Sequence, residues 1–213
     1  MSIASRTTMA NMAIEAGAKC ALFTPDEKTE EYCEIQLDDF QKSLAGDPDA
    51  VYLKELHYKA EDFVPVMACP SQVDKIRSVS ELEGTVIDQV FIGSCTNGRL
   101  EDLQAAAEIL KGKSVAPYVK LIVTPASRKV YQEAAACGAI RTLVEAGAIV
   151  THPGCGLCCG RTGGILSDGE RVVATNNRNF LGRMGTSKVE IYLASPKTAA
   201  ACAVAGKIVI PEK

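Results

Sequence analysis

Apolar residues in the second half of the chain alternate between short continuous runs and stretches with a helical period. The continuous runs predict five strands, at residues 85–95, 118–124, 148–150, 171–175 and 189–195. The stretches with helical spacing predict helices at residues 99–111, 127–146 and 196–206. Strands that alternate with helices favour an α/β fold with a parallel sheet, in which the loops at the strand ends carry the function.

The first part of the chain lacks this alternation. Residues 8–16 predict a short helix with Ala, Met and Ile on its inner face, and residues 24–62 are charged and favour helix. Residues 64–84 contain two prolines and few periodic apolar positions, so we expect an extended linker there. We therefore expect the end of a preceding α/β domain with its linker, and then a cysteine-bearing α/β domain, over residues 1–75 and 76–213.

Composition excludes several classes of function. The chain has 213 residues, and 23 basic against 26 acidic side chains give a net charge of -3, so no basic field attracts nucleic acid or anionic lipid. Aromatic residues make up 5% and Trp is absent, which leaves little for base stacking. No apolar run approaches the roughly 20 residues of a membrane span. The N-terminus lacks the layout of a signal peptide, and we expect a cytoplasmic protein.

The nine cysteines carry the strongest chemical signal. An odd number at these spacings is not typical of a disulfide scaffold, which favours reduced thiols or metal ligands. Cys95 follows a predicted strand in GSCTNGR, whereas Cys155 and Cys158 form a C-x-x-C pair inside PGCGLCCG. Adjacent parallel strands can bring these three thiols to one crevice, where glycines let the backbone curl closely around a metal site.

Spacing alone leaves alternatives open. A C-x-x-C pair is also typical of a redox site or of half a zinc site, and His152 or Cys159 could complete the zinc ligands. An iron–sulfur cluster held by three thiolates keeps one iron open for a water or a substrate hydroxyl, which suits Lewis-acid chemistry. The other cysteines stand singly, and we expect them to be buried, inert thiols: Cys20, Cys33, Cys69, Cys137 and Cys202.

Several longer motifs surround these cysteines. They are FIGSCTNGR at 91–99, HPGCGLC at 152–158 and NRNFLGRMG at 177–185, with support from NMAIEAGA at 11–18 and YLASP at 192–196. In this order they resemble the aconitase superfamily, and within it the large subunits of isopropylmalate isomerases and homoaconitases. The resemblance implies an aconitase-like three-layer α/β/α domain with a largely parallel sheet.

The resemblance also implies a reaction. It indicates a hydro-lyase that dehydrates or isomerises a hydroxy dicarboxylate, foremost 3-isopropylmalate in leucine biosynthesis. It implies a [4Fe–4S] cluster on Cys95, Cys155 and Cys158. It further implies substrate binding by Asn177, Arg178 and Arg183, and a catalytic acidic residue beside the cluster at Glu15. Two arginines in a glycine-containing loop after a strand suit this role, because a guanidinium can bind a carboxylate through two parallel hydrogen bonds.

The sequence departs from the family in length. Family large subunits are about twice as long, and their first half supplies His and Asp residues that have no counterpart here. The serine base of the family belongs to a small subunit, so we expect this chain to need that partner, and a separate N-terminal half as a further one. Homoaconitate or 2,3-dimethylmalate are alternative substrates, and a non-catalytic metal-binding or iron-sensing fragment is an alternative function.

Overall fold

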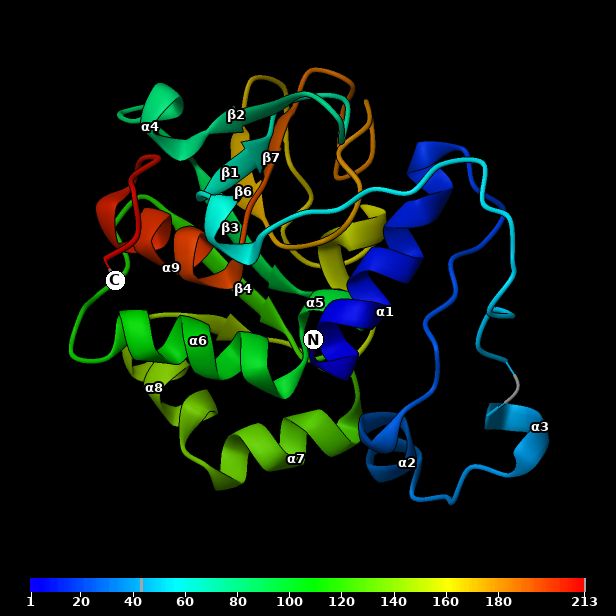
Figure 1. The fold of residues 1–213 in the computed structure, drawn as a ribbon. Coiled ribbons are helices and arrows are strands. Elements are labelled where there is room, and N and C mark those ends of the chain that lie inside the picture. The colour runs from blue at the N-terminus through cyan, green and yellow to red at the C-terminus, as the bar shows by residue number, and fades with distance from the viewer. Residues whose placement is uncertain (43, 213) are drawn as a thin grey trace. The chain divides into compact units, whose positions relative to one another are not determined.

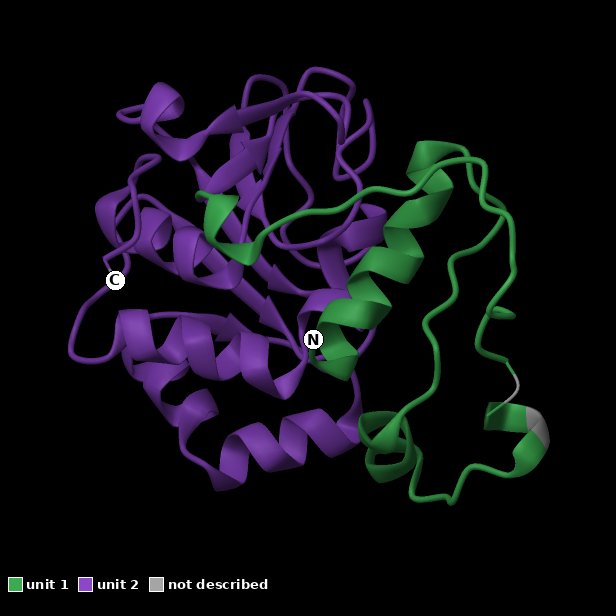
Figure 2. Ribbon diagram, in the orientation of Figure 1, with its two compact units in different colours: residues 1–64 green, residues 65–213 purple. Residues whose placement is uncertain are grey.

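The chain forms two compact units, which are coloured separately in Figure 2. The computed structural model describes residues 1–42 and 44–212. The first unit spans Met1–Val64 and the second Pro65–Lys213. The domain boundary predicted between residues 75 and 76 concerns domains of a longer protein and stays a prediction, whereas the compact units divide after Val64.

Short helices joined by irregular segments make up the first unit. In chain order they are α1 (Ile3–Met12), the 3-10 helix η1 (Ala13–Ala16), α2 (Glu27–Cys33), α3 (Asp39–Lys42) and the 3-10 helix η2 (Ala60–Asp62). The first helix begins earlier than predicted because the Ser2 hydroxyl caps it by accepting from the Ser5 backbone N–H. Gly17 ends η1 in the left-handed conformation, with φ 79°.

This first unit buries very few of its apolar side chains. Helix α1 has no buried residue, so the inner face predicted for it is wrong. Among the described side chains of the unit, Leu37 is the one apolar residue that is buried. Asp26 adds a polar contact, because it caps α2 and pairs with the Arg6 guanidinium, which holds the pKa of that carboxyl well below its usual range. The unit therefore has little core of its own.

A seven-stranded sheet is the frame of the second unit (Figure 1). Its strands are β1 (Val66–Ala68), β2 (Ile76–Ser78), β3 (Gln89–Gly93), β4 (Lys120–Thr124), β5 (Ile149–Val150), β6 (Arg171–Ala174) and β7 (Glu190–Leu193). They lie in the order β2-β1-β7-β6-β3-β4-β5. The last five of this order are parallel, whereas β1 pairs antiparallel with both β2 and β7. The predicted α/β class with a largely parallel sheet is confirmed.

The segment predicted as an extended linker is part of this sheet. Within residues 64–84, β1 and β2 form its antiparallel edge and are followed by α4 (Val79–Leu82). Met67 is fully buried, as is expected of a strand and not of a linker. The prediction was wrong because strands of three residues are too short to show an alternating pattern.

The helices of the second unit follow the predicted positions. They are α5 (Ser94–Asn97), α6 (Leu100–Leu110), α7 (Arg128–Ala136), α8 (Ala139–Glu145), the 3-10 helix η3 (Gly156–Cys159) and α9 (Pro196–Ala205). The stretch predicted as one helix at 127–146 is two helices, because Gly138 takes φ 85° between them. Within the described residues, no helix combines the length and the apolar character needed to cross a bilayer.

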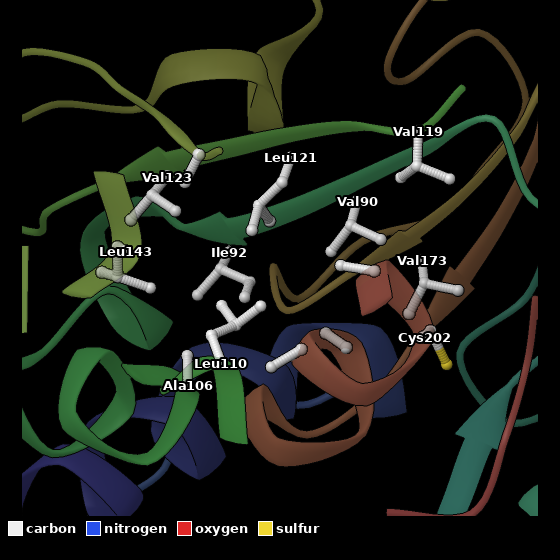
Figure 3. Packing of buried hydrophobic residues seen from close by; sticks show 14 of the residues in the cluster. Val90, Ile92, Ala106, Leu110, Val119, Leu121, Val123, Leu143, Val173 and Cys202 are labelled. Carbon is white, nitrogen blue, oxygen red and sulfur yellow. The ribbon is translucent and has the colours of Figure 1, made fainter. Parts of the chain in front are cut away.

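Alternate residues of each strand pack on opposite faces of the sheet. On one face, Val90 and Ile92 of β3 meet side chains of α6, α8 and α9, among them Leu110 and Leu143 (Figure 3). On the other face, Phe91 packs in a second cluster that the loops after β5 and β6 cover, through residues such as Leu157. The helix-covered face is therefore the main core, and the loops of the second face are free to carry chemistry.

The strand order reverses its direction next to β3. From β3 the chain runs outward through β4 to β5, and then returns to lay β6 on the opposite side of β3. The connections leaving β3 and β6 therefore diverge, which opens a crevice at the carboxyl ends of these strands. The loops that begin at Ser94 and Thr175 start at this point.

Candidate metal centre

Cys95 lies on a tight turn at the carboxyl end of β3. The turn begins at Gly93, whose φ of 143° and close approach to the Thr124 backbone leave no room for a Cβ atom. Ser94 follows with φ 80°, a conformation that is uncommon for a residue other than glycine. Ser94 is buried and Cys95 is exposed, so the turn presents the Cys95 thiol outward from a fixed backbone.

Cys155 and Cys158 lie on a glycine-rich loop that follows β5 and packs beneath the end of β4. Cys155 precedes η3 and is exposed, whereas Cys158 lies within η3 and is buried. Gly156 has φ 54°, and a Cβ there would overlap the side chain of Thr124. The Thr124 hydroxyl is 2.7 Å from that of Thr151, which fixes the start of the same loop. The glycine is needed because the loop backbone lies directly against the sheet.

These two segments bring the thiols close together. Helices α5 and η3 are in contact. Desolvation raises the pKa of the Cys155 thiol. The nearby thiols of Cys95, Cys159 and Cys158 raise it further through their charge. The Arg183 guanidinium acts in the opposite direction and favours the thiolate. Four sulfur atoms and one cation therefore share one electrostatic environment.

Arg183 reaches this environment from the loop after β6. Its Nη2 donates to the Cys158 Sγ at 3.5 Å, and its guanidinium lies 5.3 Å from the centre of the Phe180 ring. The carbonyl of Arg183 approaches Gly160 so closely that a Cβ at Gly160 would overlap it. The Nε of Arg183 is buried and has no hydrogen-bond partner within the described part of the chain. Such a buried donor indicates a missing acceptor.

Asn177 belongs to the same loop and is linked to the turn that carries Cys95. The Nδ2 of Asn97 donates to the Oδ1 of Asn177 at 2.8 Å and also to the carbonyl of Thr175. Asn177 and Thr175 are 3% and 2% exposed, so these are buried hydrogen bonds between two loops. The sequence reasoning missed Asn97, and the available signal was a short polar residue two positions after the predicted ligand.

Neighbouring asparagines hold the rest of the loop. The Asn176 Nδ2 donates to the carbonyl of Arg178 at 2.7 Å, which shapes the backbone at that residue. The Asn179 Nδ2 donates to the Cys69 carbonyl at 2.7 Å and so ties the loop to the segment after β1. Arg178 itself is half-buried. The loop is thus anchored on both sides of Asn177 and Arg178.

Six of the seven predicted site residues lie in the second unit, at the carboxyl end of the sheet. The seventh, Glu15, is exposed on η1 of the first unit. A place for Glu15 beside the thiols therefore stays a prediction, as do the individual roles of all seven residues.

The donor set is not arranged for a single metal ion. Among the residues that the structure describes, no three or more His, Cys, Asp or Glu side chains lie in a group that could hold one metal ion. Zinc at about 2.3 Å from each sulfur would draw tetrahedral thiolates to within about 4 Å of one another. His152 is exposed, on the wall of a cavity of about 380 Å³ that Cys155 and Cys159 also line.

Comparison with known proteins found a family model and several relatives that match the chain. The sequence model of the aconitase family (aconitate hydratase) matches residues 1–85 and 72–206. The chain is 50% identical to 3-isopropylmalate dehydratase large subunit 2 of Archaeoglobus fulgidus, over 100% of this chain and 51% of that protein. It is 52% identical to the 3-isopropylmalate dehydratase large subunit of Moorella thermoacetica, over 100% of this chain and 51% of that protein.

A relative with another name is as similar. The homoaconitase large subunit of Thermus thermophilus is 50% identical, over 98% of this chain and 49% of that protein. The chain thus spans about half the length of the relatives it matches. With a family match that extends over nearly all its residues, the chain belongs to the aconitase family.

Proposed function

We propose that this chain is the thiol-bearing part of the large subunit of a [4Fe–4S] hydro-lyase that acts on a hydroxy dicarboxylate, foremost 3-isopropylmalate. The observation that carries the proposal is the convergence of Cys95, Cys155 and Cys158 at the switch point of the sheet, with the Arg183 guanidinium donating to the Cys158 sulfur. Dehydratases of the aconitase family generally carry iron–sulfur clusters. A site of three thiols fits a cluster that keeps one iron open.

The residues around the thiols fit an anionic cluster. All nine cysteines are free thiols, so the three proposed ligands are available. Glycines in left-handed or extended conformations, among them Gly154 and Gly156, remove side chains from the loop that would face the cluster. Arg183 adds a positive charge beside Cys158. When bound, the cluster would supply a Lewis-acidic iron that polarises the C–OH bond of the substrate.

The chain's own polar residues would bind and orient the substrate. Arg183 has five N–H donors, and its buried Nε and its outer nitrogens allow it to bind a carboxylate while still contacting Cys158. Arg178 and Asn177 follow β6 on a loop that Asn176 and Asn179 hold in place. A carboxylate between these donors would be held in one orientation, and the charge that develops as the adjacent C–H loses its proton would be stabilised. We assign Glu15 to proton transfer or water binding beside the cluster.

Two substrates of one chemical class are consistent with the relatives. Dehydratases named for 3-isopropylmalate and homoaconitases resemble the chain to nearly the same degree, 50% to 52%. Both names indicate hydroxy acids with several carboxylates, which two arginines on one loop suit. The main proposal is 3-isopropylmalate, and homoaconitate is the second candidate.

We also propose that the chain acts only together with other polypeptide. Relatives are named large subunits, which implies a small subunit in those proteins, and we assign the general base to that partner. A further proposed partner is the remaining half of the large subunit, and the surface of the first unit supports this proposal. Its exposed apolar side chains include Leu22, Val51 and Leu53, at 89%, 98% and 106% exposure. A group of exposed apolar side chains of this kind is typical of a surface that another segment covers.

Anaerobic reconstitution with iron and sulfide tests the proposal. The chain should gain four iron and four sulfide ions and a broad visible absorption. The substitutions Cys95→Ser, Cys155→Ser and Cys158→Ser should each abolish this cluster. Cys137→Ser is the matched control, since Cys137 is an exposed thiol at the C-terminal end of α7, and it should retain full cluster content. One tightly bound zinc ion with no sulfide would contradict the proposal.

A second measurement tests the reaction. The chain would be combined with the missing half of the large subunit and the small subunit from Moorella thermoacetica, and supplied with 3-isopropylmalate or homoaconitate. Hydration or dehydration by the mixture, lost on substitution of Cys158, is the expected result. Turnover of homoaconitate alone would replace the main substrate by the second candidate, and cluster assembly without turnover of either would leave only a metal-binding role.

A further inference from the structure

The carboxamide of Asn97 joins the two loops of the site. Asn97 lies at the end of α5, two residues after Cys95. Its Nδ2 donates across the crevice to the Thr175 carbonyl and to the Oδ1 of Asn177, the latter at 2.8 Å. One side chain therefore connects the turn of a proposed cluster ligand with the loop of the proposed substrate-binding residues.

The pairing of β3 with β6 does not by itself make the connection that Asn97 makes between the two loops. The register between β3 and β6 ends at Phe91 and Ala174, so strand pairing holds the loop only up to its first residue. Just beyond, the Thr175 N–H donates to the Phe91 carbonyl at 3.0 Å, and the Thr175 Oγ1 accepts from the Gly93 N–H at 2.9 Å. Further along the loop, the Asn97 carboxamide donates to the Thr175 carbonyl and to the Oδ1 of Asn177, and so extends the connection past the end of the strand pairing.

The direction of the hydrogen bond also fixes the orientation of Asn177. A carboxamide can rotate by half a turn, which exchanges its oxygen acceptor and its nitrogen donor. Because Asn97 donates to the Oδ1 of Asn177, this oxygen stays on the Asn97 side and the Nδ2 on the other. A substrate carboxylate can only accept hydrogen bonds, so it requires a donor from Asn177.

We propose that Asn97 is a positioning residue for substrate binding. It does not contact the substrate; it orients the Asn177 carboxamide and holds the start of the 175–183 loop against the turn that carries Cys95. The inference rests on the proposed function, because it assigns Asn177 to the substrate. It predicts that loss of donation from Asn97 weakens substrate binding more than it changes turnover or cluster content.

The first experiment uses the full chain alone and needs neither cluster nor partner. Backbone amide hydrogen exchange would be compared for wild type, Asn97→Ala and Asn97→Asp. Asp has nearly the shape of Asn but its ionised carboxylate cannot donate, and it would face two acceptor oxygens. Exchange at residues 175–179 should rise at least fivefold in both variants, while β4 stays unchanged. An Asp variant that exchanges like wild type would show that only packing matters and would overturn the proposal.

The second experiment uses the assembled, reconstituted enzyme and 3-isopropylmalate. Loss of one buried hydrogen bond should raise KM about five- to tenfold, with kcat changed less than threefold and iron content equal to wild type. Asn97→Ala should add little in an Asn177→Ala background, because it acts through that residue. The proposal would be overturned if Asn97→Ala and Asn177→Ala raised KM by independent factors, or if Asn97→Ala lowered kcat alone.

The two experiments separate the inference from the function on which it rests. If the wild-type assembly turned over no hydroxy acid, the proposed function would fail, and with it the substrate-binding role of Asn97. Faster exchange in the chain alone would then still establish the link between the two loops. If the wild type were active and the exchange of residues 175–179 did not respond to Asn97, only the inference would fail.

Discussion

Substitution of Gly93 by alanine should destabilise the second unit far more than an alanine at an ordinary left-handed glycine. Gly93 has φ 143° and ψ -147°, a region that is almost restricted to glycine, and alanine would cost about 1–3 kcal/mol there. In addition, its Cβ would overlap the nitrogen, carbon and oxygen of the Thr124 main chain, which cannot rotate away. Forcing apart two paired strands adds about 1–3 kcal/mol.

The expected total for Gly93→Ala is about 2–6 kcal/mol, measured as the free energy of unfolding of the full chain in urea. With a urea slope of roughly 2 kcal/mol per molar, the midpoint should fall by about 2 M. Gly112→Ala is the matched control, since Gly112 has φ 70° and nothing within 4 Å of its would-be Cβ, and it should cost only about 1 kcal/mol. Equal losses in the two variants would refute the argument from backbone contact.

Three further predictions concern one partly buried carboxylate and two side chains of the site. Burial raises the pKa of Asp102 to about 6, above the 3.8 of an ordinary Asp, so the folded state binds the proton more tightly. The contribution of this group to the free energy of unfolding is therefore present below about pH 4 and is lost as the pH rises through 6. In urea titrations at different pH values, Asp102→Asn should abolish this loss, which amounts to roughly 2 kcal/mol. Asn179→Ala should cost about 1–3 kcal/mol of unfolding free energy, because it removes the buried Nδ2 that donates to the Cys69 carbonyl at 2.7 Å. Arg183→Lys should raise KM of the assembled enzyme about tenfold, because an ammonium cannot contact Cys158 and a carboxylate in the same planar arrangement.

Each of these has a neighbouring control. Glu108→Gln, at an exposed position further along the same helix, should leave the pH slope of stability unchanged. Gln104→Ala, at an exposed position of α6, should cost less than about 0.5 kcal/mol. Arg161→Lys, an exposed arginine, should leave KM unchanged. A pH slope that survives Asp102→Asn, a neutral Asn179→Ala, or equal KM changes at the two arginines would each contradict the corresponding reasoning.

The sequence predicted the parts of the fold whose pattern is long enough to be unambiguous. Helix α6 was placed to within a residue or two, because Leu103, Ala106 and Leu110 repeat on one face over three turns. The parallel strands were found because they are largely apolar, as β3 is at four of its five residues. The segment containing β1 and β2 was misread, since three-residue strands gain their stability from pairing in the sheet and show no pattern of their own.

The sequence named the cysteines and arginines of the candidate site, whose roles stay predictions, and it did not name the residues that support them. Cys95 and Arg183 stand in motifs whose residue types already suggest ligands, whereas the role of Asn97 depends on β6 lying beside β3. That neighbourhood is a property of strand order, which local sequence does not encode. The contact between Arg183 and Cys158 likewise joins two loops 25 residues apart through the tertiary fold.

The order of the strands also dictates when the site can form. The Cys95 turn and β4 are complete early in the chain, but the opposite wall exists only after β6 has paired with β3 across a separation of about 80 residues. Pairings of such long range are slow steps in folding, because the loop must close before any contact compensates for its lost entropy. During synthesis, Cys155 and Cys158 would emerge before Asn177 and Arg183. If the proposed cluster were inserted at that stage, it would meet solvent where the finished protein places a buried amide and a guanidinium, so we expect its insertion to follow folding of the second unit.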